Sequence, residues 1–225
     1  MGRLITGCIA DVPYDEPRKL ATPKSRARMT LLDLCSYLGL IAIVLATVNI
    51  CLGLLIAVRY SPWRTWPHRR INYFRIHNWS GYLLLLITVA HPIVLLFSRE
   101  PRFRALDIAL PLWSPSQPFE NTIGAVALYA LTVVVITSYY RLSMKRRTWK
   151  RFHYVVYVAA AASFLHGLLT DPHLKNSPVD YFDGEKVLVE VCFLVVAVAS
   201  YLALRYRIRK HARRAALLPV VEHES

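Results

Sequence analysis

The stretch that decides the fold runs from Tyr73 to Phe97 and reads Y-F-R-I-H-N-W-S-G-Y-L-L-L-L-I-T-V-A-H-P-I-V-L-L-F. It is long and apolar enough to cross a bilayer, because a membrane helix needs about 20 predominantly apolar residues. It nevertheless carries two histidines, His77 and His91, which are 14 residues apart. Ionisable side chains are costly inside a membrane helix, so their presence indicates a functional site with a specific partner.

The apolar residues of the whole chain fall into five such segments, at 31–58, 71–97, 122–140, 152–170 and 187–204. Because lipid cannot satisfy exposed backbone groups, each segment is expected to form a helix. The 225 residues, 55% of them hydrophobic, therefore predict one all-α, polytopic membrane helical bundle of about five transmembrane helices. The predicted divisions are a polar, basic N-terminal tail (1–30), the helical domain (31–205) and a basic cytoplasmic C-terminal tail (206–225).

The net charge of +14 comes mostly from short segments that flank the apolar ones, where basic residues normally set topology. Nucleic acid is therefore not an expected partner. The positive-inside rule places 59–70, 141–151 and the C-terminus in the cytoplasm, and 98–121 and 171–186 outside. Trp63 and Trp66 suit an interfacial belt, and His68 is expected to face solvent. Five spans then put the N-terminal tail outside despite its own basic cluster, which conflicts with the rule.

The four cysteines form no C-x-x-C and no C-x-x-C-H motif. Redox dithiol, zinc-ribbon and covalently attached haem sites are therefore not expected. No segment has the charged start, short apolar core and cleavage site of a removed signal peptide. These features predict an integral, multi-pass protein, which we expect in the bacterial inner membrane.

A second apolar segment repeats the histidine pattern, with His153 and His166 placed 13 residues apart. In the predicted topology the second and fourth helices run in the same direction, so their histidines lie at two matched heights about 20 Å apart. We expect one haem b between His77 and His153 and a second between His91 and His166. Bis-histidine ligation fills both axial positions of the iron, which favours electron transfer over ligand binding.

The angular positions of these histidines fit regular helices less well. At about 100° per residue, His77 and His91 lie about 40° apart, whereas His153 and His166 lie about 140° apart. The fourth helix is therefore expected to be bent or irregularly wound, with Gly167 as a candidate position, or to present two faces to the haems. Pro92 lacks a backbone donor and is expected to kink the second helix.

Other interpretations of the histidines stay open at this point. They include hydrogen bonds between helices, a quinone site, a proton relay and a metal-transport site. Arg75 and Arg151 are predicted to bind haem propionates, although arginines beside spans also serve as topology determinants. The further candidates are Arg70, Arg147, Arg99 and Arg102 for the propionates, Tyr154, Tyr157 and Phe164 for the pocket wall, and Asn49 and Glu190 for the bundle interior.

The pattern H-x13-H on one helix and H-x12-H two helices later resembles the ferric reductase-like transmembrane domain family. The surroundings agree, because A-H-P follows a leucine-rich run and W-K-R-F-H-Y-V-V-Y precedes L-H-G. The resemblance covers residues 49–205. The family includes ferric-chelate reductases, the membrane half of NADPH oxidases and the haem-binding membrane subunit of a bacterial methionine sulfoxide reductase system. It implies haem ligation by His77, His91, His153 and His166, and outward electron flow.

The chain departs from this family in two respects. Many members have six spans, whereas five are predicted here. Oxidases and eukaryotic ferric reductases continue into a flavin and nicotinamide domain, but no G-x-G dinucleotide fingerprint occurs in this sequence. A separate electron donor, either a flavoprotein or a quinol, is therefore expected.

The prediction is a transmembrane diheme b-type cytochrome, an oxidoreductase component that passes electrons from a cytoplasmic donor to an external acceptor. Ferric iron, dioxygen and a partner redox protein are the candidate acceptors, and the basic cytoplasmic loops suit an acidic donor. One alternative is a haem-binding subunit of a larger respiratory or reductase complex. Another is a haem-free metal or proton transporter or scaffold.

Overall fold

A computed structural model describes residues 30–58, 72–171 and 182–216. These residues form helices and turns, and no strand occurs among them. The all-α fold expected from the sequence is thereby confirmed. In chain order the elements are α1 (Leu31–Val58), α2 (Tyr73–Ile93), the 3₁₀ turn η1 (Val94–Phe97), α3 (Ala105–Ala109), the 3₁₀ turn η2 (Pro111–Trp113), α4 (Pro118–Tyr139), α5 (Arg146–His153), α6 (Val155–Leu169) and α7 (Gly184–Ala216).

Five helical stretches within the described ranges are long and apolar enough to cross a membrane. The second consists of α2 continued by η1, and the fourth of α5 and α6 together; the full set is Leu31–Val58, Tyr73–Phe97, Pro118–Tyr139, Arg146–Leu169 and Gly184–Arg213. At a rise of about 1.5 Å per residue each exceeds the hydrocarbon thickness of a bilayer. The chain is an integral, multi-pass membrane protein, as its sequence predicts.

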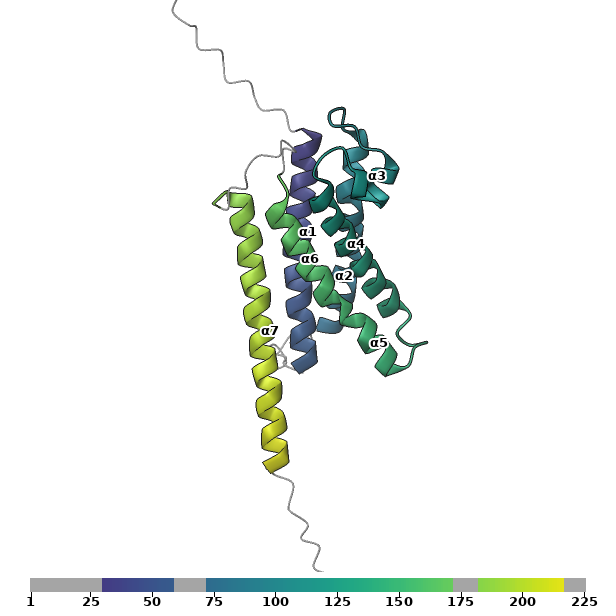
Figure 1. The fold of residues 1–225 in the computed structure, drawn as a ribbon. Coiled ribbons are helices and arrows are strands. Elements are labelled where there is room, and N and C mark those ends of the chain that lie inside the picture. Colours follow the sequence, from purple (N-terminus) through teal and green to yellow (C-terminus); the bar gives the residue numbers. More distant parts are fainter. Residues whose placement is uncertain (1–29, 59–71, 172–181, 217–225) are drawn as a thin grey trace, which may run out of the picture.

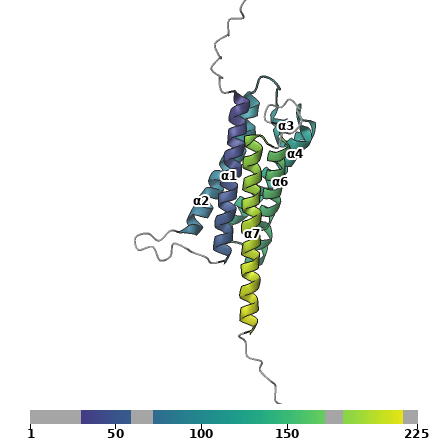
Figure 2. The ribbon, with the colours of Figure 1, turned by 90° about the vertical axis from the view of Figure 1, so that its left-hand side faces the viewer.

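The long helices stand side by side and alternate in direction (Figures 1 and 2). α1 packs along α2, α4 packs along α6, and α7 lies against α1 and α6. The fourth span, α5 with α6, therefore runs in the same direction as α2. This arrangement allows His77 and His153 to lie at one depth in the bundle and His91 and His166 at another. α7 contacts α1 and α6 and stands at the edge of the bundle (Figure 1).

The tightly packed core is small and lies between α1, α6 and α7. It consists of Ile43, Phe164, Val189, Cys192 and Val196. Most large apolar side chains point outward instead, as on α7, where Val198 and Leu202 are more than half exposed. An apolar surface of this extent is suited to lipid rather than to water.

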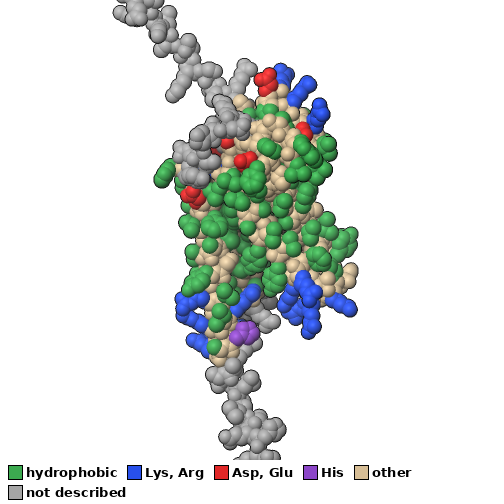
Figure 3. All heavy atoms as spheres, viewed as in Figure 1, with side chains coloured by type: hydrophobic (Ala, Val, Ile, Leu, Met, Phe, Trp, Pro, Cys, Tyr) green, Lys and Arg blue, Asp and Glu red, His purple; other side chains and the backbone are tan. Residues whose placement is uncertain are grey.

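The two ends of the bundle differ in charge (Figure 3). At the end that carries α3, acidic side chains appear together with Lys or Arg groups, whereas the opposite end shows blue Lys or Arg groups without red ones. We call these the acidic end and the basic end. The starts of α1, α4 and α7 lie at the acidic end, and the ends of those helices lie at the basic end (Figure 1).

The elements differ from the sequence prediction mainly at their boundaries. The fourth span begins at Arg146, six residues before the predicted start, because the basic α5 continues it toward the basic end. α7 reaches Ala216, so part of the predicted tail 206–225 is helical. Between the second and third spans, α3 and η2 cover the acidic end, where Gln117 and Asp171 exchange two hydrogen bonds of 3.1 and 2.9 Å.

Candidate functional site

The structure brings the four histidines together in two pairs across the bundle. The ring centres of His77 and His153 are 6.3 Å apart near the basic end, with an interplanar angle of 70°. Those of His91 and His166 are also 6.3 Å apart, with an angle of 77°, near the acidic end. The two pairs have nearly the same geometry, and they are the pairs that the sequence spacing leads us to expect.

A break in the fourth span allows the two unequal histidine spacings to match. The α-helix stops at His153 and restarts at Val155, and the amide of Tyr157 donates to the carbonyl of Tyr154 at 3.1 Å. Such a 3₁₀ turn advances about 120° per residue instead of about 100°. Over three residues it adds about 60° of rotation, which moves His166 toward the face that carries His153.

The irregularity therefore lies at Tyr154 and not at Gly167. Gly167 stays within regular α6, where an added Cβ would meet the Val189 side chain at 3.4 Å. On the second span, α2 changes to the 3₁₀ turn η1 at Val94, two residues after Pro92.

Hydrogen bonds fix three of the imidazole rings through the same nitrogen. Nδ1 of His77, His91 and His166 lies 3.1, 2.8 and 2.8 Å from the backbone oxygens of Asn49, Cys35 and Glu120 respectively. A carbonyl oxygen can only accept, so Nδ1 carries the proton in each case. Nε2 is then the nitrogen left to bind a metal, and a hydrogen bond of this kind orients the ring and raises its basicity.

A glycine makes each of these three contacts possible. Gly39, Gly53 and Gly124 follow Cys35, Asn49 and Glu120 by four residues each. In an α-helix the carbonyl of residue i points toward residue i+4, so a side chain there would block the approach of an imidazole. A Cβ at Gly39, Gly53 or Gly124 would lie 3.1, 3.2 or 2.9 Å from Cε1 of the facing histidine.

His153 is held differently from the other three histidines. Its Nδ1 lies 3.4 Å from the Ser138 hydroxyl, which can donate or accept. Its ring stacks on Trp149, with centres 5.1 Å apart and an angle of 26°. The His153 ring is therefore positioned by the Trp149 indole, whereas each of the other three rings is positioned by a backbone carbonyl and a glycine.

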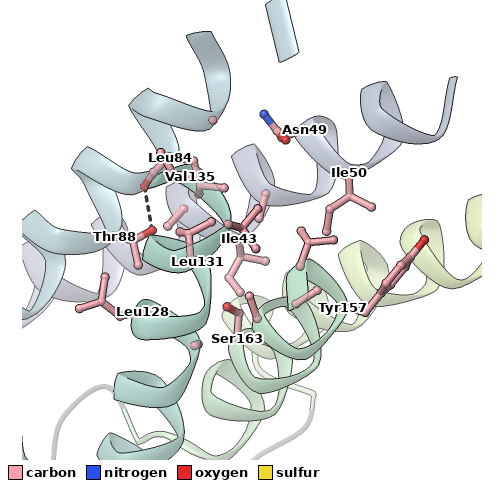
Figure 4. A pocket seen from close by; sticks show the side chains of 18 of the residues that line it. Ile43, Asn49, Ile50, Leu84, Thr88, Leu128, Leu131, Val135, Tyr157 and Ser163 are labelled. Atoms are coloured by element: carbon pink, nitrogen blue, oxygen red, sulfur yellow. Dashed lines mark hydrogen bonds between the residues drawn. The ribbon is translucent and has the colours of Figure 1, made fainter. Parts of the chain in front are cut away.

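A cavity of about 970 Å³ runs through the bundle and is lined by all four histidines. Its volume is at the upper end of the range for ligand cavities. Figure 4 shows side chains of α1, α2, α4 and α6 around it, among them Ile43, Leu84, Leu131 and Val135. This stretch of the wall is mostly apolar, and the Thr88 hydroxyl on it donates to its own helix at the Leu84 carbonyl, 2.8 Å away.

The residues present fit bis-histidine haem. The midpoint between ring centres 6.3 Å apart lies about 3.2 Å from each, which leaves room for metal–nitrogen bonds of about 2 Å. Trp149 Nε1, on the cavity wall, is a buried donor without a hydrogen-bond partner among the described residues. A haem propionate beside His153 would satisfy this donor. The same described residues contain no group of three or more His, Cys, Asp or Glu able to hold a metal ion.

The structure does not bring the predicted arginines to the cavity. Arg75 and Arg151 are exposed and are not among the residues that line it, and the same holds for Arg147, Arg99 and Arg102. Arg70 and His68, like Trp63 and Trp66, lie outside the described residues. The basic residues that do line the cavity near His153 are instead Arg141, Arg146 and Lys150.

The other candidates have mixed outcomes. Tyr154 and Tyr157 line the cavity, whereas Phe164 is part of the apolar core. Asn49 is buried, and its side-chain amide donates to the His77 carbonyl at 2.8 Å and to the Ser80 hydroxyl at 2.7 Å. Glu190 is half-buried and does not line the cavity.

Two kinds of site residue escaped the sequence analysis. Gly39 and Gly53 are 14 residues apart, as are His77 and His91, and this shared period is the signal that would have found them. Lys186, at the start of α7, is only 6% exposed and donates to the carbonyls of Gly167 and Thr170 at the end of α6. Nothing in its local sequence distinguishes it from an ordinary flanking lysine.

Comparison with known proteins gives one match. The sequence model of the family described as ferric reductase like transmembrane component matches residues 38–164, which is more than half of the chain. The match includes His77, His91 and His153 and ends two residues before His166. No curated protein and no solved structure matches the chain.

Proposed function

Because the chain belongs to the ferric reductase-like transmembrane family, we propose that this membrane redox component is a diheme b-type cytochrome that conducts electrons across the bilayer. The observation that carries the proposal is that two histidine pairs line a single cavity, one near each end. In both pairs the ring centres are 6.3 Å apart. Haem, which this family generally binds, supplies one-electron redox chemistry when it is held in such a site.

The chain's own residues have separate roles in this proposal. His77 and His153 hold one haem iron, and His91 and His166 hold the other. Backbone carbonyls and glycines on α1 and α4 keep three of the rings in a single tautomer and orientation. With both axial positions occupied by imidazole, the iron has no open position, so the acceptor would be reduced without binding to it.

Trp149 and the basic residues of α5 complete the site near the basic end. The indole N–H of Trp149, which has no hydrogen-bond partner among the described residues, would donate to a propionate, and Arg146 and Lys150 line the cavity beside it. These residues replace Arg75 and Arg151 as our candidates for propionate contacts. The wall between the histidine pairs is mostly apolar, so a low dielectric is expected around the haem groups there.

The charges at the two ends support an orientation in the membrane, and with it the proposed direction of electron flow. We assign the basic end, with His77 and His153, to the cytoplasm, and the C-terminus with it. The electron donor would be a separate cytoplasmic flavoprotein or a quinol, and the acceptor would approach the acidic end. In a bacterium this corresponds to the inner membrane, with ferric iron, dioxygen or a partner redox protein outside.

Electron transfer across a sealed membrane tests this proposal. Purified protein is reconstituted in liposomes that enclose ferricyanide, and dithionite is added outside. We expect reduction of the enclosed ferricyanide by the wild-type protein and a loss of at least tenfold in this rate in the His91→Ala variant, because one haem cannot bridge about 20 Å of bilayer alone. Equal rates in protein-free liposomes, or reduction without any bound haem, would refute the conduit.

A further inference from the structure

Among the four cavity histidines, His153 is the one whose tautomer its surroundings leave open. At His77, His91 and His166 a carbonyl oxygen lies against Nδ1 and can only accept, so Nε2 always remains free for a metal. The Ser138 hydroxyl, 3.4 Å from Nδ1 of His153, can donate as well as accept. When it donates, the proton of the neutral ring lies on Nε2, and that nitrogen then cannot bind a metal.

The His153 ring is also confined less closely than the other three rings. Each of those rings lies against a glycine, and none of the glycines in the described residues faces His153. Its other neighbour is the Trp149 indole, which stacks on it with ring centres 5.1 Å apart. Stacking holds the plane of a ring, but it does not determine which of the two nitrogens carries the proton.

The backbone around His153 is interrupted, unlike that around His77. His153 is the last residue of the eight-residue helix α5, and α6 begins at Val155. No residue of α5 is buried, and Figure 1 shows α5 at the outside of the bundle. His77 lies within the 21-residue helix α2, which packs along α1. A side chain on a short helix with few buried contacts can withdraw with less repacking than one in a continuous span.

On these observations, and resting on the proposed function, we infer that His153 is an exchangeable ligand that gives its place on iron to a small, uncharged diatomic molecule. His77, His91 and His166 stay bound. In the exchange the bond between iron and Nε2 of His153 breaks, and one bond between iron and the incoming molecule forms. The released imidazole stays neutral, so no proton or electron leaves the site. The acceptor at the acidic end is still reduced without binding to iron, and the basic end gains a separate ligand-binding site.

Carbon monoxide is the probe that tests this inference, because it binds ferrous haem only where an axial position opens. The full chain in phosphatidylcholine nanodiscs is reduced with dithionite, and the carbon monoxide difference spectrum is compared with the haem content from the pyridine haemochrome assay. We expect about one bound carbon monoxide for every two haems. Two haems per chain with no carbon monoxide spectrum would overturn the inference and leave the proposed function standing, whereas a folded chain without haem would refute the proposed function.

Two variants that each retain a single haem assign the carbon monoxide to one end of the bundle. His91→Ala is expected to keep the haem between His77 and His153 and to bind about one carbon monoxide per haem. His77→Ala is expected to keep the haem between His91 and His166 and to bind none. Equal binding in the two variants would show a general loosening of the bundle and would contradict a special role for His153.

A matched pair of substitutions at Ser138 tests the tautomer argument itself. Ser138→Asp offers Nδ1 of His153 a group that can only accept, which keeps Nε2 free for iron and is expected to weaken carbon monoxide binding about tenfold. Ser138→Thr keeps the hydroxyl and should bind carbon monoxide as the wild-type protein does. Unchanged affinity in Ser138→Asp with full haem content would contradict the inference. If Ser138→Asp holds no haem, the comparison of His91→Ala with His77→Ala decides alone.

Discussion

At the scale of single residues, three of the four histidines have the same surroundings. Each imidazole ring lies against a backbone carbonyl and against the glycine four positions after that carbonyl. Gly124 leaves the least room, since its Cβ would lie 2.9 Å from Cε1 of His166. Gly124→Ala is therefore expected to displace this ring, at an overpacking cost of about 1–3 kcal/mol, and to reduce haem content toward one per chain. The pyridine haemochrome assay measures this loss.

Gly184→Ala is the control for that substitution, because nothing lies within 4 Å of a Cβ at this position. It should leave the haem content unchanged. Full haem content with an unaltered spectrum in Gly124→Ala would contradict the role that we give to the glycine.

Asn49 also acts at the residue scale, through the packing of α1 on α2. Asn49→Leu removes the amide that donates to the His77 carbonyl and to the Ser80 hydroxyl. Losing two buried hydrogen bonds is expected to cost about 1–3 kcal/mol of stability. In thermal denaturation in detergent, Asn49→Leu should have a lower Tm than Thr132→Val. The latter variant loses only the 2.8 Å hydrogen bond from the Thr132 hydroxyl to the Leu128 carbonyl of its own helix. Equal Tm values for the two variants would remove Asn49 from this role.

At the scale of elements, Lys186 joins the start of α7 to the end of α6 within one turn of His166. Its ammonium group caps the carbonyls of Gly167 and Thr170 and lines the cavity. A fixed positive charge beside a haem favours the reduced form, which carries less positive charge. Lys186→Gln is therefore expected to lower the midpoint potential of one of two haems in a redox titration and to leave the other unchanged.

Lys186→Arg keeps the positive charge and should restore that potential. Two unchanged potentials in Lys186→Gln, or equal shifts of both, would show that the lysine is only a helix cap.

The spans are the elements that the sequence predicts best. Runs such as L-L-L-L-I-T-V-A predict a helix because the bilayer allows no other local structure, and α1 has the predicted bounds, Leu31–Val58. The 13-residue spacing on the fourth span predicts an irregular helix, but the position at Tyr154 was not predictable. No Gly or Pro marks it, since the break depends on where His153 and His166 must meet α2.

Side-chain partners were less predictable than the helices. The histidines stand out because charge is costly in lipid, whereas arginines occur beside every span for topological reasons, so Arg75 and Arg151 could not be distinguished from Arg141 and Arg146 by sequence alone. The place of each residue on its helix or turn, which the sequence does not give, decides which of them reaches the cavity.

At the scale of the whole molecule, the difference in charge between the acidic end and the basic end predicts how the bundle is oriented in the membrane. A green fluorescent protein fused after Ser225 is expected to fluoresce in bacterial cells, and alkaline phosphatase at the same position to be inactive, because we assign the basic end to the cytoplasm. A phosphatase fusion after Asp171, at the acidic end, should be active. The reverse pattern of reporter activity would contradict the assigned orientation and, with it, the proposed direction of electron flow.

The central claim concerns which histidines share a haem. It is tested most directly by haem quantitation and reduced-minus-oxidised spectra of the single variants His77→Ala and His91→Ala and of two double variants. We predict two haems b per wild-type chain, one in each single variant, one in the double variant of His77 and His153, and none in that of His77 and His91. Equal haem loss in the two double variants would contradict the pairing, and a folded wild-type protein without haem would contradict the whole account.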